Sequence, residues 1–246
     1  MTLAPTIRIK KERGNADAQM LAILELRRAL ACSGRKRRSS HSHPARALNG
    51  AMSAVLAPIV ASLGALESAD GAIQTEPFLA ACRLVLPVFD KLGVAFAAAK
   101  SDVSGNIERL AKRAPDHAAL FDICRAEMAA GTQASDAGCC KGLLWLKRFL
   151  EFAANLLEGL AAEPRTAPLK EVAHGAYATT LKPYHGWLAS SAFAVVLQFP
   201  PSREAFVNSL NGDYENMTEV ARRLRPTLER VHKFLKENGL HDESKV

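Results

Sequence analysis

The sequence predicts an all-α fold, and two observations lead to that prediction. From Met52 onward the pattern is typical of helices almost throughout, and no run of β-branched residues alternates with polar ones as in a strand. Pro and Gly residues divide this pattern into helix-sized segments, because both interrupt helices. We therefore expect helices near 52–66, 76–90, 92–114, 116–130, 137–161, 167–182, 185–198, 202–211 and 216–238.

The boundaries between these helices follow from particular residues. Pro183 is expected to mark a junction or kink just before His185, since proline cannot continue a helix without losing a hydrogen bond. The Asn-Gly-Asp sequence at 211–213 is typical of a turn and not of a domain boundary. The main interruptions are Pro115, Gly131, Pro164, Pro183 and Pro200-Pro201.

Charge divides the chain into two parts. Residues 1–50 contain eleven Lys or Arg and three Asp or Glu, a net charge of +8, whereas the remainder has a net charge of −1. We interpret 1–50 as a basic, partly disordered extension and 51–246 as one helical domain. The extension could be a solvated tail, a nuclear or transit signal, a nucleic-acid contact or a patch for anionic lipid. No nucleic-acid binding is expected of the domain itself.

The cysteines and the lengths of the apolar runs indicate the kind of cellular compartment to expect. The five cysteines are an odd number in a chain that is not Cys-dense, so we expect no disulfide framework and a reducing compartment. The adjacent Cys139 and Cys140 lack the partner spacing of a zinc site, and no metal or cofactor is expected. The longest apolar run, 53–66, is too short to span a bilayer.

Polar residues share one face of the predicted helix at 92–114. Asp102, Asn106 and Arg109 lie at i, i+4 and i+7, and together offer a carboxylate, an amide and a forked cation. Gly105 beside them leaves room for a ligand to approach the backbone. The alternative is an ordinary solvated face with one Asp–Arg contact.

A second motif combines aromatic and basic residues. In the helix at 141–157, Trp145, Phe149, Phe152 and Leu156 form one apolar stripe, with Arg148 on its flank. Such a stripe is also typical of an ordinary core, and sequence alone does not separate the two possibilities.

Three motifs together resemble one family. They are Asp-Val-Ser-Gly-Asn-Ile (102–107), Trp-Leu-Lys-Arg (145–148) and Tyr-His-Gly-Trp (184–187), and their order and spacing resemble those of the glycolipid transfer protein family. The resemblance runs from about Met52 to the C-terminus. It implies a two-layer helical fold that encloses a hydrophobic lipid pocket, and a carrier that makes or breaks no bond.

The resemblance also implies roles for individual residues. Asp102 would accept from the N–H of a ceramide amide and His185 would donate to its carbonyl, since a buried amide must have both groups satisfied. Asn106, Arg109 and Trp145 would bind the sugar, with the indole stacked on the sugar ring.

Apolar residues in the matched segments are expected to hold the hydrocarbon chains, although simple core packing is the alternative for each. Trp187 would suit contact with a membrane surface, and a buried Trp is the alternative there. The predicted chain-binding residues are Phe89, Phe96, Phe152, Leu156, Leu181 and Phe193.

The predicted function is transfer of glycosphingolipids between membranes by a monomer that is cytoplasmic and peripheral to membranes. Three alternatives stay open: ceramide-1-phosphate transfer, a glycolipid sensor acting through a protein partner, and an enzyme using His185 with Asp102. Asn106 stands where phosphate-binding relatives carry Lys and therefore favours a sugar. Arg109 favours phosphate more than the Lys typical of glycolipid binders, and Ser244 replaces a Tyr that would cover the sugar.

Overall fold

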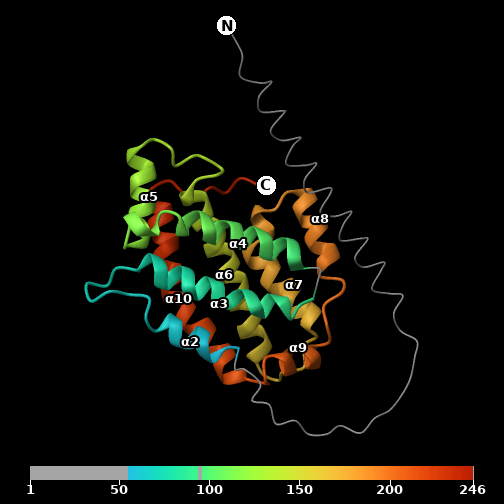
Figure 1. Cartoon of the computed structure of the whole chain (residues 1–246). Helices are drawn as coiled ribbons and strands as arrows, with labels where there is room; N and C mark the ends of the chain where they lie inside the picture. The colour runs from blue at the N-terminus through green and yellow to red at the C-terminus, as the bar shows by residue number, and fades with distance from the viewer. Residues whose placement is uncertain (1–54, 94–95, 246) are drawn as a thin grey trace.

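The computed structural model describes residues 55–93 and 96–245, and this part of the chain is helical (Figure 1). The all-α prediction is confirmed; two isolated β-bridges, Glu67–Ile73 and Gln74–Ala119, join loops. The predicted extension at 1–50 lies outside the described residues. The helices are α2 (Ala57–Leu63), α3 (Thr75–Asp90), α4 (Ala97–Ala111), α5 (Leu120–Ala129), α6 (Cys139–Ala161), α7 (Leu169–Thr180), α8 (Trp187–Val196), α9 (Arg203–Ser209) and α10 (Tyr214–Glu237), with 3-10 turns η2 (Ala114–Asp116) and η3 (Lys182–Tyr184).

Each predicted helix is present, and the differences lie at the ends. The helix expected from residue 92 begins only at Ala97, because Gly93 adopts a φ of 102°, outside the helical region. The predicted turn at 211–213 is confirmed, since Asn211 and Gly212 both have positive φ values. Pro183 lies inside η3, which ends at Tyr184, the residue directly before His185, so the predicted junction is also confirmed.

The helices form two layers. In one layer α2 packs against α3 and α3 against α4; in the other α10 packs against α6 and α6 against α7. Contacts of α6 with α4 and of α10 with α2 join the layers. In Figure 1, α3 and α4 cross in front of α6, and α8 lies at the edge of the molecule.

Helix α6 is the centre of this arrangement. Of its 23 residues, 16 are buried, which is expected for a helix covered on several sides. Helix α10 is amphipathic instead: Met217, Val220, Leu224, Leu228 and Val231 follow one another at three- or four-residue spacing and are all buried. The layers therefore share one apolar core, with α6 at its middle.

Candidate functional site

The three polar residues predicted on α4 do lie together. Asn106 is buried, and its Nδ2 lies 3.4 Å from Oδ2 of the exposed Asp102. This distance is long for a hydrogen bond, so both groups retain capacity for a ligand. The surrounding protein desolvates the Asp102 carboxyl and raises its pKa, and the nearby Arg109 opposes that shift. Nothing lies within 4 Å of a Cβ placed on Gly105, so the predicted open approach to the backbone is present.

Helix α4 approaches α6 closely at Gly142. A Cβ on this glycine would lie 2.9 Å from Leu110 Cδ1 and 3.5 Å from Asn106 Oδ1. The missing side chain therefore permits the contact between the helices. It also brings Asn106 to Gly142, which lies three residues before Trp145 on α6.

Arg109 reaches the start of α6. Its Nη1 donates to the carbonyl oxygens of Asp136 at 3.3 Å and Gly138 at 3.2 Å. The guanidinium therefore holds the loop before α6 in addition to facing the α4 site. This double role was not foreseen from the sequence, because the loop lies far from Arg109 along the chain.

The rings of Trp145, in α6, and His185, directly after η3, lie next to each other. Their ring centroids are 5.8 Å apart at an angle of 31°. The Nδ1 atom of His185 lies 3.1 Å from the Tyr177 hydroxyl, and a hydroxyl that donates to Nδ1 leaves the ring proton on Nε2. Burial, with a contribution from Arg148, lowers the pKa of His185 to about 4. The ring is therefore neutral at pH 7 and can donate one hydrogen bond.

The enzyme alternative would have His185 act together with Asp102, and each of these side chains contacts a different residue. Asp102 is bonded to Asn106 and His185 to Tyr177. Among the described residues, no group of three His, Cys, Asp or Glu side chains could hold a metal ion.

Four of the predicted chain-binding residues form a closed cycle of aromatic rings, which we call the aromatic cluster. Phe89 lies 6.3 Å from Phe96 and 5.8 Å from Phe152, and Phe193 lies 6.0 Å from Phe96 and 5.9 Å from Phe152. Leu156 and Leu181 are buried in the same core. Phe193 is also 5.8 Å from His185, so the cluster begins directly behind the polar residues.

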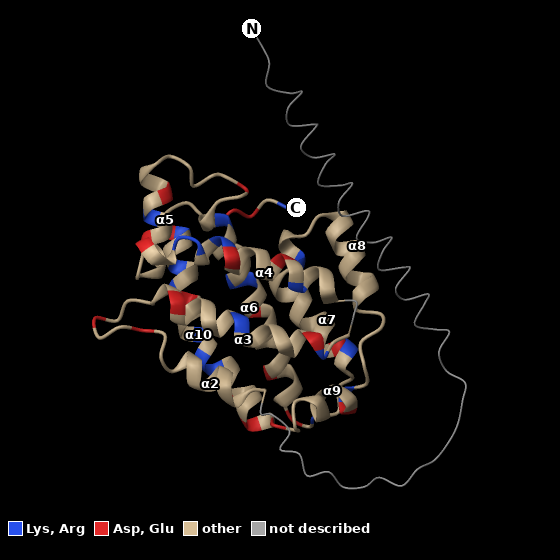
Figure 2. Ribbon diagram, viewed as in Figure 1, with Lys and Arg blue, Asp and Glu red and all other residues tan. Residues whose placement is uncertain are grey.

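Two large aromatic side chains are exposed near this end of the molecule. Trp187 is 80% exposed and Phe199 is 61% exposed, so the alternative of a buried Trp187 is wrong. Helix α8, which begins at Trp187, carries no charged side chain (Figure 2). Phe199 was not singled out from the sequence, because one aromatic residue before two prolines carries no recognisable pattern. No helix in the described part of the chain is long and apolar enough to span a bilayer.

The tail after α10 returns to the α6 surface. Asp242 pairs with Lys141, and its carbonyl oxygen accepts from Arg148. These contacts keep the pKa of Asp242 well below its usual range, mainly through Lys141 and Ser244. The tail therefore reaches the helix that carries Trp145. The resemblance implied a tail near the sugar, but not these contacts with Lys141 and Arg148.

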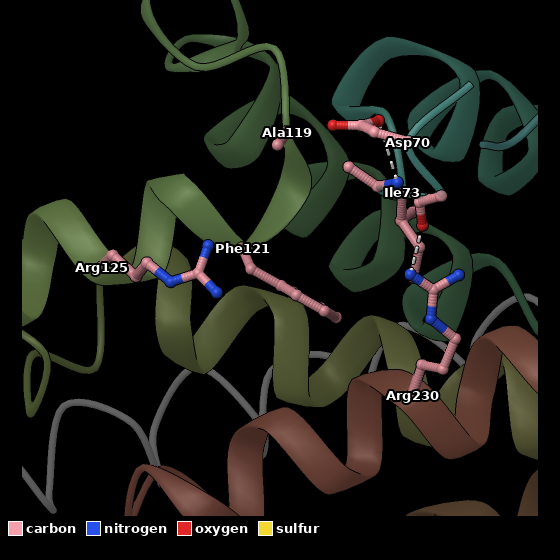
Figure 3. A pocket seen from close by; sticks show the side chains of 8 residues that line it. Asp70, Ile73, Ala119, Phe121, Arg125 and Arg230 are labelled. Carbon is pink, nitrogen blue, oxygen red and sulfur yellow. Dashed lines mark hydrogen bonds between the residues drawn. The ribbon is translucent and has the colours of Figure 1, made fainter. Parts of the chain in front are cut away.

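A separate cavity of about 280 Å³ lies between α5, the loop before α3, and α10 (Figure 3). Its two arginines already have protein partners. Arg125 pairs with Asp122, and Arg230 pairs with Glu67 and donates to the Gly71 carbonyl. None of the predicted site residues lines this cavity.

Comparisons with known proteins agree with the motif resemblance. The family model for glycolipid transfer protein (GLTP) matches residues 73–212. Glycolipid transfer protein 1 of Arabidopsis thaliana is 34% identical over 195 residues, which cover 76% of this chain and 96% of that protein. The solved structure of FAPP2, which is described as selecting simple glycosphingolipids with the GLTP-fold, has a TM-score of 0.69 at 27% identity and covers 75% of this chain and 95% of that one.

Human ceramide-1-phosphate transfer protein, solved with 12:0 ceramide-1-phosphate, is similar in fold. Its TM-score is 0.69 at 19% identity, with 75% of this chain and 97% of that chain covered. At this identity the likeness concerns the fold alone.

Proposed function

Because the chain belongs to the glycolipid transfer protein family, whose members are lipid transfer proteins, we propose that it moves glycosphingolipids between membranes. The recognition centre, defined as Asp102, Asn106, Arg109, Trp145 and His185, binds the sugar and the amide. The aromatic cluster and its neighbours receive the hydrocarbon chains. No bond is made or broken, and the carrier acts as a monomer in the cytoplasm.

The ceramide amide is the part of the ligand that both glycosylated and phosphorylated sphingolipids share. The Asp102 carboxylate accepts from its N–H, and Nε2 of the neutral His185 donates to its carbonyl. This pairing is supported by the position of His185 between Trp145 and Phe193, at the junction of polar and apolar groups. An amide buried there without partners would cost about 1–3 kcal/mol for each unsatisfied group.

The choice of a neutral sugar rests on one observation, the pairing of the Lys and Arg side chains of α4 and α6 with protein groups. Every Lys and Arg side chain within α4 and α6 already has a protein partner, whereas a phosphate needs cations that are free to pair with it. The sugar, by contrast, needs an aromatic face and amide or carboxylate groups, which Trp145, Asn106 and Asp102 supply. The pairs are Lys100 with Asp90, Arg109 with two carbonyl oxygens, Lys141 with Asp242, Lys147 with Glu151, and Arg148 with the Asp242 carbonyl.

The hydrocarbon chains must displace side chains that now touch one another. Rings of the aromatic cluster contact each other at centroid distances of about 6 Å, so entry of a chain requires them to part. Contacts with hydrocarbon then replace contacts between rings, and both are apolar and close-packed. Uptake is therefore a modest rearrangement and not the opening of a rigid cavity.

The uncharged surface of α8 makes the reversible contact with the membrane. Trp187 and Phe199 place exposed aromatic rings at its two ends. Aromatic side chains of this kind partition to the bilayer interface without a permanent anchor.

A second candidate is ceramide-1-phosphate transfer. It is favoured by Arg109, a forked cation beside Asn106, and it is compatible with the fold, since the human protein of similar fold was solved with ceramide-1-phosphate. A sensor that acts through a protein partner is the third candidate, and residues 1–50 would be its second contact.

Transfer between vesicles tests the proposal. Fluorescent galactosylceramide, ceramide-1-phosphate and phosphatidylcholine are supplied in parallel to the full-length protein and to Trp145→Ala, with Trp145→Phe as the matched aromatic control. We expect fast transfer of galactosylceramide, reduced about tenfold in Trp145→Ala because the stacking face is lost. Transfer of ceramide-1-phosphate alone would establish the second candidate. No transfer of any lipid by the folded protein would overturn the proposal and favour the sensor.

A further inference from the structure

Arg148 is a charged side chain beside the recognition centre that none of the proposed ligand contacts uses. It is 1% exposed, in the middle of the buried helix α6. Its guanidinium carbon lies 3.4 Å from the ring centroid of Tyr184 and 4.8 Å from that of Trp145. Its Nη2 donates to the carbonyl oxygen of Asp242.

The groups around this cation do not amount to a normal ion pair. Within residues 55–93 and 96–245, no carboxylate lies at salt-bridge distance from Arg148, and its Nε is buried without a hydrogen-bond partner. Burial lowers the pKa of the guanidinium, but arginine remains charged at any physiological pH. Two aromatic faces and one carbonyl are therefore its direct partners, while the Asp242 and Glu151 carboxylates act on the charge only from beyond salt-bridge distance; overall stability explains such an arrangement poorly.

The partners of Arg148 come from three segments that the recognition centre needs. Trp145 lies one turn earlier on α6, Tyr184 immediately precedes His185, and Asp242 belongs to the tail after α10. A planar guanidinium packed against two rings restricts the plane of each ring, which a flexible ammonium cannot do. The tail is itself held against α6 by the pair between Asp242 and Lys141.

We propose that Arg148 is the positioning residue that sets the orientation of Trp145 and of the segment carrying His185, and that it makes both depend on the tail. Arg148 acts through these residues and does not touch the lipid. The inference deepens the proposed function and rests on it, because the orientation concerns the surface that would meet the sugar and the amide.

The positive charge has a second effect. It lies near His185 and contributes to keeping that ring neutral. The titratable and charged groups that face Arg148 are His185, His241, Tyr184, Asp242 and Glu151, and the two carboxylates oppose the effect of its charge. The plane of the guanidinium and its charge are separate properties, so different substitutions can remove them one at a time.

Two substitutions separate the two properties. Arg148→Lys keeps the charge and loses the planar fork; Arg148→Met loses both. In a Trp187→Phe background, Trp145 is the remaining tryptophan, so the long-wavelength edge of the near-ultraviolet circular dichroism, where tyrosine and phenylalanine do not absorb, reports on Trp145. We expect both variants to lose most of this signal, and the pKa of His185, followed by NMR, to rise only in Arg148→Met. Neither measurement needs a lipid. If Arg148 had a purely structural role, the Trp145 signal and the pKa of His185 would change together in both variants.

Lipid-transfer measurements test whether Arg148 also affects recognition of the sugar headgroup. We expect the preference for galactosylceramide over ceramide to fall about tenfold in Arg148→Lys. Lys233→Met, which removes a 74% exposed charge on α10, is the matched control and should keep the preference. If the Arg148→Met protein does not fold, the Lys variant still tests the orientation.

The dependence on the tail is tested by a double-mutant cycle on the full-length chain. Lys141→Met removes the side-chain partner of Asp242, and we expect it to lower the sugar preference by about threefold when Arg148 is present and to have no further effect in Arg148→Lys. Additive effects would overturn the link to the tail. An unchanged Trp145 signal and preference in Arg148→Lys would overturn the positioning role. If the wild type transfers no lipid, the proposed function fails, whereas the Trp145 and His185 signals still decide the role of Arg148.

Discussion

The recognition centre and the aromatic cluster lie next to each other, joined by the contact of His185 with Phe193, yet they are built differently. In the recognition centre, polar groups with fixed directions keep hydrogen-bonding capacity: Asn106 lies 3.4 Å from Asp102, and the Nδ1 atom of His185 lies 3.1 Å from the Tyr177 hydroxyl. In the aromatic cluster, rings meet at several angles, from 41° between Phe89 and Phe152 to 87° between Phe152 and Phe193. Under the proposed function, the first region would distinguish ligands by hydrogen bonds, and the second would accept any shape that fills apolar space.

This difference teaches where selectivity can arise. A lost hydrogen bond in a dry site leaves a polar group unsatisfied, which costs about 1–3 kcal/mol. When one apolar side chain replaces another of similar size, its neighbours repack, and the change costs about 1 kcal/mol of stability or less. Substitutions in the recognition centre should therefore change which lipid is carried, and substitutions in the cluster should change mainly how well any lipid is carried.

The largest effect is expected for Asp102→Val. The variant leaves the ceramide amide N–H without an acceptor, so transfer of glycosylated and phosphorylated sphingolipids alike should fall about 100-fold. Vesicle transfer with both lipids measures it. Asp102→Asn is the control, since its amide oxygen can still accept, and it should lose less. Equal transfer by the Val variant and the wild type would remove Asp102 from the recognition centre.

Asn106→Lys should change the type of lipid and not only the rate. A new ammonium group beside Asp102 supplies a cation for phosphate, and the sugar loses an amide, so the ratio of ceramide-1-phosphate to galactosylceramide transfer should rise about tenfold. Asn106→Ala removes the amide without adding charge and should lower sugar transfer alone. If the ratio does not move in the Lys variant, headgroup choice does not depend on this position.

A smaller effect is expected for Phe193→Leu in the aromatic cluster. The ring stacks on Tyr177 at 4.4 Å, and its loss should lower the free energy of unfolding by about 1 kcal/mol. Transfer should change about twofold, with the ratio of the two sphingolipids unchanged. Urea unfolding and the two-lipid transfer assay measure these quantities. A change in the ratio as large as that of Asn106→Lys would contradict the separation of the two regions.

The smallest effect is expected from pH on the binding of galactosylceramide. Since the pKa of His185 is lowered to about 4, the ring stays neutral from pH 8 to pH 5, and binding should change by less than about twofold. Tryptophan fluorescence titration with galactosylceramide measures it. A large loss of binding at pH 5 that is absent in His185→Gln would contradict a neutral donor.

Stability should respond to pH where binding does not. Below about 6.5, the unfolded chain protonates His185 while the folded protein excludes the proton, so the contribution of this residue is complete above pH 6.5 and is lost as pH falls toward 4. Urea unfolding at pH 8 and pH 5 should therefore show a smaller decrease for His185→Gln than for the wild type.

Sequence reasoning reached the helices and the motif residues because both depend on local patterns. Proline and glycine positions fixed most helix boundaries, and helical spacing alone placed Asp102, Asn106 and Arg109 on one face. The start of α4 was misplaced because it depends on the backbone conformation of Gly93, which helical spacing does not reveal.

The contacts that sequence reasoning missed join distant parts of the chain. Arg148 meets Asp242, 94 residues later, and Lys141 meets the same residue 101 positions away. The Tyr177 hydroxyl beside His185 depends on how α7 and η3 meet. Such pairings require the packed helices, because no periodic pattern within one helix indicates them.

The central claim is that the recognition centre selects a neutral sugar because the cations of α4 and α6 already have partners. The most direct test is to incubate the full-length protein with phosphatidylcholine vesicles containing equal amounts of galactosylceramide and ceramide-1-phosphate, and to weigh the recovered complex by native mass spectrometry. We predict that the bound lipid is galactosylceramide. Ceramide-1-phosphate as the main bound lipid would mean that Arg109 or a neighbouring cation leaves its protein partner to bind phosphate, and would contradict the claim.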